Sequence, residues 1–505
     1  MKNTNLIYGV KDKPGFSKTL IFALQQVLAI LAATVVVPVI INSNTAEAVM
    51  KGEATIVSQM SQSAALFGAG VGTIIYLLFT KFKSPVFLGS SFAFLGSMTA
   101  AFAGATTMAA GYLGLIIGAA MAGLVYVIIS LIVKRAGTDW ISKIMPAAVI
   151  GPTVAVIGLS LSSNAIGDLF KGGNLIKDVN RVVWLNPETK IHEVLEIPTM
   201  VPTASPYVAL ICGLVTLAVV IICSVYGKKM MKMIPFIIGI VAGYATACIF
   251  TLIGELTTSP ELIVIDFSAF STLGSSSAWV PEFTFIEAFT HPNGVGNIGS
   301  LIGTVAVAYI PVAFVVFTEH LADHKNISSI IGSDLTKDPG LHRTLLGDGV
   351  GSMVGAFFGG CPNTTYGESV GCVAISKNGS VVTILTAAII CVIAAFFAPF
   401  TIFLRTIPSC VMGGVCISLY GFIAVSGLKM IQKVDLNKEY NLFTVSVILI
   451  AGVGGMVLTF GKVTITSVAC ALILGIIVNL IGKKAAKKDA LEDASLSEEK
   501  EDKVE

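Results

Sequence analysis

Apolar stretches about as long as a membrane helix follow one another along nearly the whole chain, with short polar segments between them. A helix needs roughly 20 apolar residues to cross a bilayer. From Ser84 to Val133 no residue is charged, and two crossings fit there, joined by a turn rich in Gly and Ala. The pattern predicts fourteen spans, near residues 20–41, 61–80, 85–104, 110–133, 145–162, 206–226, 234–256, 300–324, 344–359, 364–376, 380–404, 409–427, 440–459 and 463–482.

The composition agrees with this pattern. Of the 505 residues, 54% are apolar and 12% are charged, whereas about a quarter of the residues in a soluble domain are charged. These proportions argue against a soluble enzyme, a nucleic-acid-binding protein and a disordered scaffold. The 32 basic and 30 acidic residues nearly cancel, so net charge indicates no partner. The sequence predicts an all-α polytopic protein of the lipid bilayer.

Basic clusters follow every even-numbered span, and short cytoplasmic loops carry an excess of Lys and Arg. The alternation predicts cytoplasmic termini and outer loops at 42–60, 163–205 and 257–299. We expect the acidic segment 489–505 to be a solvated cytoplasmic tail. The clusters contain Lys81, Lys83, Lys134, Arg135, Lys143, Lys228, Lys229, Lys232, Lys325, Lys337, Arg343, Lys377, Lys429, Lys433, Lys438, Lys483, Lys484, Lys487 and Lys488.

The third and tenth spans are short and interrupted. One begins Ser-Pro-Val-Phe-Leu-Gly-Ser-Ser-Phe at residues 84–92, and the other Gly-Gly-Cys-Pro-Asn-Thr-Thr-Tyr-Gly-Glu-Ser at 359–369. Non-helical backbone survives at membrane depth only where protein buries it or where it lines a cavity. Such segments at matching places in the two halves of a chain indicate a transport site between inverted repeats. Close helix packing alone is the alternative explanation for the Gly and Ser residues.

Span eight carries two acidic residues four positions apart, Glu319 and Asp323, which therefore share a helical face. His320 and His324 form a second such pair on an adjoining face. Ionisable groups inside a membrane usually have a function, although a helix ending near residue 318 would leave these groups in the cytosol. Glu-His-x-x-Asp-His is not a zincin motif, and the nine separate cysteines form no metal-ligand pattern. We predict no metal, no cofactor, no disulfide and no phosphate-binding loop.

A carboxylate accepts hydrogen bonds but cannot donate them. Glu319 and Glu368 therefore favour a small planar ligand with N–H groups, and free backbone N–H groups at helix starts suit its carbonyl oxygens. Phe92, Tyr366 and Tyr420 are candidates to stack on or border the ring. Because burial disfavours a charged carboxylate, we expect either glutamate to be able to carry a coupling proton.

These residues resemble those of the nucleobase/ascorbate transporters, in particular the bacterial uracil permease branch. The resemblance covers nearly the whole chain. It is most specific at Gln25-Gln26, at Ser90-Ser91-Phe92-Ala93-Phe94, at Thr318-Glu319-His320, at Asp338-Pro339-Gly340-Leu341-His342-Arg343 and at Asn363-Thr364-Thr365-Tyr366-Gly367-Glu368.

The resemblance implies fourteen spans in seven-plus-seven inverted repeats. A core domain would comprise residues 1–135 and 300–405, and a gate domain residues 136–299 and 406–488. The implied activity is uracil import by proton symport through alternating access in the cell membrane. Glu319 and Glu368 would bind the base, the backbones of Phe92 and Gly367 its carbonyl groups, and Tyr366, Tyr420 and Ala33 would border the pocket. Glu319, Asp323, Glu368 and His324 are the candidates for proton coupling.

Three departures keep alternatives open. Purine-selective relatives tend to have Gln-Asn where this chain has Glu368-Ser369, and some members have His where it has Gln26. Asp323 stands where some proton-coupled members have His. The alternatives are a xanthine or broader nucleobase permease, Na⁺ coupling, or an anion exchanger or channel of the same fold. The family also suggests a homodimer through the gate domain, and nothing in the sequence indicates an enzyme.

Overall fold

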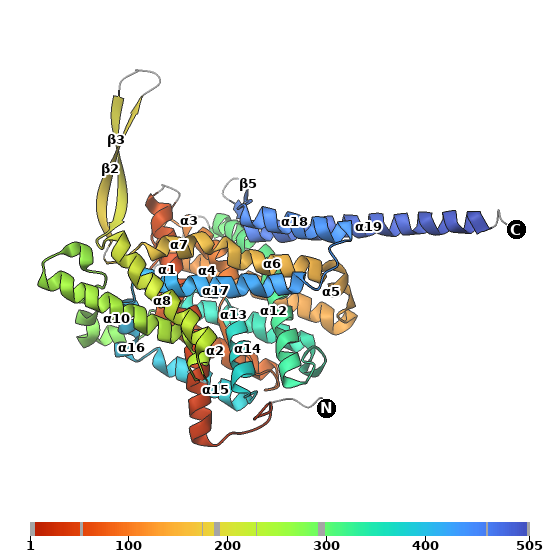
Figure 1. Ribbon diagram of the computed structural model, residues 1–505, viewed down its shortest axis with the longest axis horizontal. Coiled ribbons are helices and arrows are strands. Elements are labelled where there is room, and N and C mark those ends of the chain that lie inside the picture. The colour runs from red at the N-terminus through yellow and green to blue at the C-terminus, as the bar shows by residue number, and fades with distance from the viewer. Residues whose placement is uncertain are drawn as a thin grey trace.

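The computed structural model describes residues 6–50, 54–173, 175–185, 192–228, 230–290, 298–460 and 463–501, and these are predominantly helical (Figure 1). Within these ranges, nine helices are long and apolar enough to cross a membrane. A tenth candidate is the pair α15 (Val381–Ala394) and α16 (Ala398–Arg405), which is bent by 82°. These helices indicate a multi-pass membrane protein.

Each of the fourteen predicted ranges overlaps a helix, but five of them are not long, unbroken apolar helices. The ranges 85–104 and 364–376 each begin with a short strand, and 380–404 contains the bend between α15 and α16. The range 440–459 holds the short α18, and 344–359 holds α13, which includes charged residues. Within the described residues, length and hydropathy therefore identify nine or ten candidate crossings, fewer than the fourteen that the sequence pattern predicts.

One group of helices packs around α2, α4, α12 and α13. In this group α13 lies against both α2 and α4, while α12 contacts α4 and α15 contacts α1 and α2. Its helices are α1 (Phe16–Met50), α2 (Gln62–Phe79), α3 (Leu95–Ala103), α4 (Met108–Ala136), α11 (Thr284–Thr290), α12 (Ile298–Ile331), α13 (Leu341–Gly359), α14 (Gly367–Ser376), α15 and α16.

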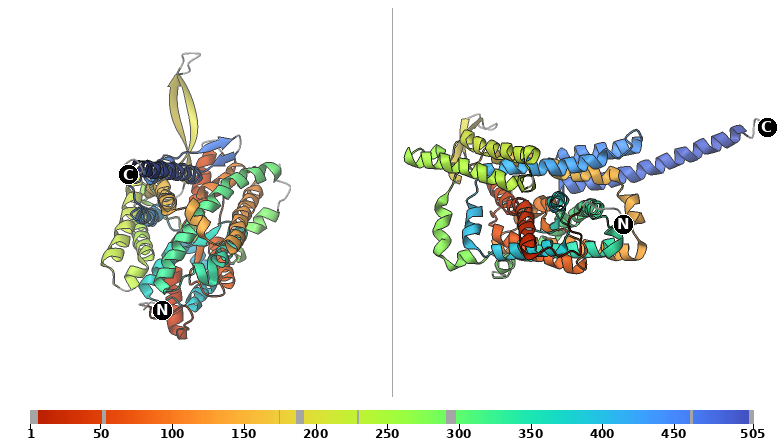
Figure 2. Two further views of the ribbon diagram at one scale, coloured as in Figure 1. Left: turned by 90° about the vertical axis from the view of Figure 1, so that its right-hand side faces the viewer. Right: turned by 60° about the horizontal axis from the view of Figure 1, so that its bottom comes forward.

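The second group packs around α6 and α17. Figure 2 shows it, in yellow-green and blue, as a layer over the first group. Its helices are α5 (Asp139–Ile144), α6 (Ala147–Ser160), α7 (Ser162–Leu169), α8 (Pro206–Tyr226), α9 (Met230–Met233), α10 (Pro235–Leu256), α17 (Ser409–Ile431), α18 (Glu439–Val453) and α19 (Ser467–Glu501). The last of these continues beyond the bundle into the predicted acidic tail (Figure 1), of which residues 502–505 lie outside the described ranges.

Glycine allows α2 and α13 to approach each other closely. A Cβ added to Gly68 would lie 2.6 Å from the carbonyl oxygen of Gly355, so a larger residue at this position would force the two helices apart. The Asn363 side chain fills the remaining space and donates a hydrogen bond to the carbonyl of Gly68 over 3.0 Å. Small residues at helix crossings are a usual means of close packing in membranes.

The two interrupted spans meet in a two-stranded antiparallel sheet. Strand β1 (Leu88–Ser90) pairs with β4 (Asn363–Thr365), with Leu88 opposite Thr365 and Ser90 opposite Asn363. All six residues are buried. The 3-10 helix η1 (Phe92–Phe94) and α3 follow the first strand, and α14 follows the second. This pairing satisfies backbone groups that would otherwise lack partners at membrane depth.

Two further hairpins, one in the expected loop 163–205 and one where the predicted spans 440–459 and 463–482 meet, correct a purely all-α description. Strand β2 (Leu175–Leu185) pairs with β3 (His192–Pro202) along eleven positions and stands away from the helices (Figure 1). The sequence predicted only an exposed loop at 163–205. A shorter hairpin joins β5 (Leu458–Phe460) to β6 (Val463–Ile465).

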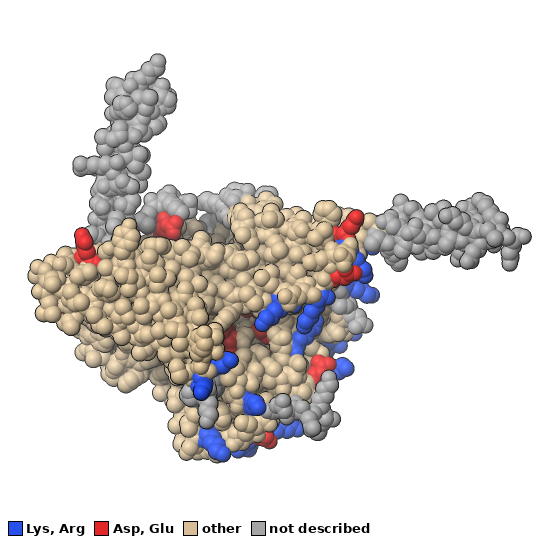
Figure 3. All heavy atoms as spheres, viewed as in Figure 1, with Lys and Arg blue, Asp and Glu red and all other residues tan. Residues whose placement is uncertain are grey.

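Charged side chains are unevenly distributed over the surface. In Figure 3, Lys and Arg gather on the lower right of the visible face, whereas its left part is almost entirely uncharged. Large apolar side chains such as Leu256, Ile450 and Ile481 are more than 60% exposed, at 78%, 76% and 65%. A broad uncharged surface with exposed aliphatic residues suits contact with lipid.

Candidate functional site

A cavity of about 390 Å³ lies between the two groups of helices. Its walls combine carboxyl groups, hydroxyl groups and aromatic rings. The first group contributes Ala29, Ser91, Phe92, Glu319, Ala322, Asp323, Asn326, Thr364, Tyr366, Gly367, Glu368, Val370, Gly371, Cys372 and Ile375. The second contributes Val154, Ser224, Lys232, Pro235, Phe236, Phe422, Ile423 and Ser426. Of these lining residues, Lys232 alone is basic.

Helix α12 turns Glu319 and Asp323 toward the cavity, as their spacing predicted. The helix continues to Ile331, so the alternative in which it ends near residue 318 is wrong. Thr365 donates a hydrogen bond to Oδ2 of Asp323 over 2.9 Å. A Cβ added to Gly367 would lie 3.7 Å from Oδ1 of the same carboxyl group. Asp323 therefore faces the junction of β4 and α14.

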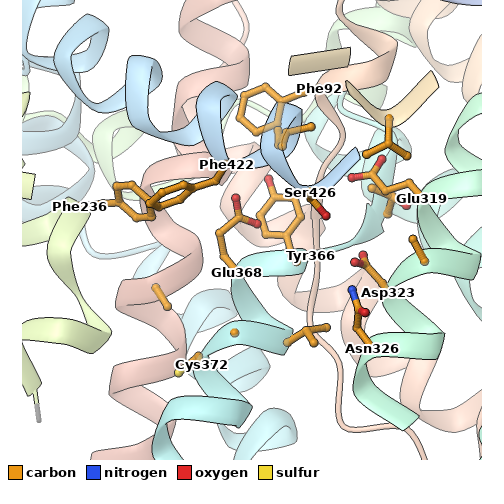
Figure 4. Close-up of a pocket in the computed structure, with 18 of the residues that line it drawn as sticks. Phe92, Phe236, Glu319, Asp323, Asn326, Tyr366, Glu368, Cys372, Phe422 and Ser426 are labelled. Atoms are coloured by element: carbon orange, nitrogen blue, oxygen red, sulfur yellow. The ribbon is translucent and has the colours of Figure 1, made fainter. Parts of the chain in front are cut away.

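The second interrupted span supplies the opposite wall. Gly367 and Glu368 are the first two residues of α14, whose initial N–H groups have no carbonyl within the helix to bind. In Figure 4, Glu368 and Glu319 extend into the cavity from opposite sides, with the ring of Tyr366 between them in this view. The Tyr366 hydroxyl donates to the carbonyl oxygen of Ser90 over 2.7 Å. This bond fixes the ring against strand β1.

Aromatic side chains form much of the remaining wall. Phe92 lines the cavity, and its ring makes an edge contact with Tyr420, the centroids being 5.5 Å apart. Tyr420 is buried behind Phe92 and is not among the lining residues. On the opposite side, Phe236 of α10 and Phe422 of α17 contact each other at 5.9 Å (Figure 4). Ala33 is completely buried and does not line the cavity either.

His320 and His324 lie off the cavity, on the part of α12 that packs against neighbouring helices. Nδ1 of His320 is 2.7 Å from Oδ2 of Asp348 on α13. Nε2 of His324 is 2.7 Å from the hydroxyl of Tyr76 on α2. Both histidines are completely buried. The predicted coupling residue His324 therefore has no direct access to the cavity.

Two positions at which the chain departs from some relatives contact each other. The Gln26 side chain on α1 donates a hydrogen bond to the Ser369 hydroxyl on α14. The same hydroxyl accepts the backbone N–H of Phe87 over 3.0 Å. Ser369 therefore links α1, the start of β1 and the helix that carries Glu368.

Sequence reasoning missed several lining residues. Phe236 and Phe422 lie in uniformly apolar spans, and Ser426 and Asn326 lack any distinctive motif. Lys232 was recognised only as one member of a cytoplasmic basic cluster. None of these side chains has a local pattern that separates a cavity position from a packed or exposed one, so only the arrangement of helices identifies them.

The cavity has the chemistry of a binding site for a small, flat and polar molecule. Three carboxyl groups can accept hydrogen bonds, backbone N–H groups at the start of α14 can donate them, and rings border the space. Among the described residues no group of three or more His, Cys, Asp or Glu side chains is arranged to hold a metal ion.

The sequence matches the model of the xanthine/uracil permeases, described as a permease family, over residues 17–201 and 199–461. It is 35% identical to the uracil permease of Bacillus subtilis (strain 168), with 97% of this chain and 98% of that protein covered. It is 33% identical to the uracil permease of Bacillus caldolyticus, with 96% and 98% covered. The corresponding protein of Escherichia coli (strain K12) is also 33% identical, with 95% of each covered.

Two solved structures share the fold. The transmembrane domain of the cyanobacterial bicarbonate transporter BicA gives a TM-score of 0.52 at 15% identity, with 94% of this chain and 99% of that chain covered. The murine anion transporter Slc26a9 in its inward-facing state gives 0.58 at 11% identity, with 93% and 69% covered.

The apolar helices, the cavity with its three carboxyl groups and these matches indicate a membrane transporter. The chain belongs to the nucleobase/ascorbate transporter family, as the sequence motifs predicted.

Proposed function

We propose that this protein imports uracil, or a closely related nucleobase, by proton symport through alternating access. The observation that carries the proposal is the presence of Glu319 and Glu368 on opposite sides of one cavity with aromatic walls. Full-length similarity to three uracil permeases supports the choice of substrate.

Uracil presents two N–H donors and two carbonyl acceptors on a flat ring. In the proposed complex Glu319 and Glu368 accept from its N–H groups, and the backbone N–H groups at Phe92 and Gly367 donate to its carbonyls. Tyr366 and Phe92 border the ring directly. Tyr420 and Ala33 do not line the cavity. Tyr420 acts by packing against the Phe92 ring, and Ala33 by the buried packing of α1.

The basis for the proposed proton coupling is that Glu319, Asp323 and Glu368 all line one cavity. Carboxylates close together cannot all ionise without mutual repulsion, and burial adds to the cost of each charge. A proton taken from outside lowers the negative charge and prepares the cavity for a neutral base. In this proposal Glu319, Asp323 and Glu368 exchange the proton, and His324 acts through its contact with Tyr76.

Alternating access in this proposal uses fourteen spans in two inverted repeats of seven. The core domain, residues 1–135 and 300–405, moves against the gate domain, residues 136–299 and 406–488. The cavity between the two helix groups supports this division. The protein lies in the cell membrane with both termini in the cytoplasm, and two copies associate through their gate domains.

Other substrates and ions give distinct expectations. A xanthine or broader nucleobase carrier would show competition between uracil and purines, and a Na⁺-coupled carrier would respond to a sodium gradient. The shared fold of BicA and Slc26a9 raises the possibility of an anion exchanger or channel. Three carboxyl groups against a single lysine in the wall disfavour anions.

The test is uptake of labelled uracil into proteoliposomes under an imposed gradient. We expect an inward proton gradient to drive accumulation and a protonophore to abolish it, while a sodium gradient has no effect. Glu319→Gln should abolish uptake without loss of folded protein. Accumulation driven by sodium alone would reject proton coupling, competition by xanthine would broaden the substrate range, and undiminished uptake by Glu319→Gln would reject the site.

A further inference from the structure

A second polar cluster lies inside the first helix group, apart from the cavity. His320 of α12 and Asp348 of α13 are 0% and 1% exposed, and neither is among the cavity-lining residues. Their side chains are joined by a 2.7 Å contact between Nδ1 and Oδ2. The proposed transport mechanism uses neither of them, so the reason for burying two ionisable groups here requires its own explanation.

The hydrogen-bond partners of His320 indicate how many protons the two side chains hold together. Thr344 donates its one hydroxyl hydrogen to the carbonyl of Leu341 over 3.1 Å. Nε2 of His320 is 3.1 Å from the same hydroxyl oxygen. With the Thr344 hydrogen directed at the Leu341 carbonyl, Nε2 carries a hydrogen and donates it to Thr344. The short contact on the other side of the ring then needs a further hydrogen between Nδ1 and Oδ2. It belongs either to an imidazolium paired with a carboxylate or to a neutral imidazole paired with a carboxylic acid.

Burial leads independently to the same count. A neutral histidine beside an ionised aspartate would leave a net negative charge in a membrane-embedded interior, which is very costly. One added proton makes the pair neutral overall in either of the two arrangements. The alternatives therefore differ only in where the hydrogen sits, and both hold one proton more than a neutral His and an ionised Asp.

The surrounding groups do not supply a compensating charge. The ring of His324 stacks on that of His320 with the centroids 3.9 Å apart, and its Nδ1 donates to the His320 carbonyl over 2.9 Å. Its Nε2 is 2.7 Å from the Tyr76 hydroxyl. A neutral His324 meets both contacts when Nε2 accepts from Tyr76. The other titratable groups around the pair are Tyr126 of α4, whose ring is 6.3 Å from His320, and Glu319 and Asp323 on the cavity side of α12.

We propose that His320 and Asp348 form a one-proton site that keeps its proton throughout the transport cycle and holds the cavity wall in position. His320 fixes the rotation of α12, which directs Glu319 and Asp323 into the cavity. Oδ1 of Asp348 faces Thr364 of β4, a lining residue, without a well-aligned hydrogen bond. The pair thus joins α13 to α12, which carries one wall of the cavity, and lies next to Thr364 in the other. The pair has this role whichever substrate or ion the protein transports.

The experiment compares the pH dependence of thermal unfolding in detergent for the wild type and Asp348→Asn. In an unfolded chain, Asp is ionised above about pH 5 and His loses its proton near pH 6.5. The folded wild-type pair holds one proton throughout, so above about pH 6.5 its stability falls as pH rises. In the folded variant the two side chains hold no extra proton. In the unfolded variant, His320 binds a proton below about pH 6.5, so the stability of the variant falls as pH drops.

The ratio of the two unfolding constants should therefore change by about tenfold per pH unit between about pH 5 and 9. The wild-type melting temperature should fall steadily relative to that of the variant as pH rises. Parallel curves would overturn the proposal, because they would mean that the wild-type pair binds no extra proton. Asp435→Asn, at a half-exposed carboxyl group in the loop before α18, should give curves parallel to the wild type.

A second measurement applies if Asp348→Asn does not fold. In His320→Asn, Asp348 must hold the proton alone as a neutral carboxylic acid. We expect an infrared band of a protonated carboxyl group that persists at pH 8 and is absent from the double variant His320→Asn/Asp348→Asn. Absence of this band from the single variant would show that the interior tolerates the lone negative charge, which would also overturn the proposal.

Discussion

The two interrupted segments perform the same structural task with different side chains. Each has three extended residues followed by a short helix: β1, η1 and α3 in one, and β4 and α14 in the other. The strands pair with each other, and further bonds from Ser91 to Pro362 and from Tyr366 to Phe87 extend the pairing at its two ends. Each segment thus satisfies backbone groups of the other, so neither is a complete structure alone.

The chemistry, in contrast, is concentrated in the second segment. After its strand, the first segment presents Ser91 and Phe92 to the cavity and carries no ionisable group there. The second presents Tyr366, Gly367 and Glu368. Related backbone arrangements therefore do not contribute equally to binding. We expect substitutions in the second segment to remove recognition, and substitutions in the first to affect packing and the shape of the wall.

Among substitutions in the two interrupted segments, the largest effect should come from Glu368→Gln. The amide has nearly the same shape as the carboxyl group but loses the charge, and an N–H₂ donor replaces one of the two acceptor oxygens. A hydrogen bond to a charged group contributes about 1.5–3 kcal/mol, and repulsion between donors adds to this loss. We expect uptake of labelled uracil in proteoliposomes to fall more than 100-fold.

The matched control for this substitution is Glu255→Gln, at an exposed glutamate near the end of α10. It should leave uptake unchanged. The melting temperature of Glu368→Gln should stay close to that of the wild type, which separates a loss of binding from a loss of folding. If Glu368→Gln transported uracil at a rate within threefold of the wild type, the conclusion that the second segment supplies the recognition groups would be wrong.

A smaller effect is expected from Gly89→Ala in the first segment. An added Cβ would approach the ring of Tyr366 more closely than any carbon–carbon contact allows. Because Tyr366 is fixed by its bond to Ser90, the ring cannot turn away without losing that bond. Overpacking typically costs about 1–3 kcal/mol. We expect a clearly lower melting temperature and about 30-fold less uptake.

Gly303→Ala is the comparison for this prediction, since an added Cβ there would meet no atom within 4 Å. It should behave as the wild type in both measurements. A normal melting temperature for Gly89→Ala together with normal uptake would mean that strand β1 and the Tyr366 ring can separate freely. The pairing of the two segments would then be less restrictive than their geometry implies.

The two interrupted segments could be predicted from the sequence, because breaks in the apolar pattern are visible locally. Gly, Pro and hydroxyl residues before a short apolar run identified both interrupted segments, and four-residue spacing placed Glu319 and Asp323 on one face. The pairing of β1 with β4 could not be predicted, since the two strands are separated by more than 270 positions and each has only three residues. Their apolar and hydroxyl residues show no clear alternation.

The partners of buried histidines were also beyond sequence reasoning. His320 and His324 have the same spacing as the two acidic residues, and nothing local distinguishes a cavity face from a packed face. Only the positions of α2 and α13 decide that these rings meet Tyr76 and Asp348. For the same reason the predicted wall residues Tyr420 and Ala33 lie behind the cavity, while Phe236 and Phe422 line it.

The smallest of the three effects should come from Phe92→Ala, which removes the main apolar side chain that the first segment presents to the cavity. An aromatic contact contributes about 0.5–1.5 kcal/mol beyond area burial, so we expect about a tenfold rise in KM for uracil. The maximal rate should change by less than about threefold, because Phe92 carries no exchangeable proton. Phe443→Ala, at a 60% exposed position on α18, should leave KM unchanged. A large fall in maximal rate at unchanged KM would mean that Phe92 acts in the conformational step instead, and the first segment would then contribute to movement rather than to the binding surface.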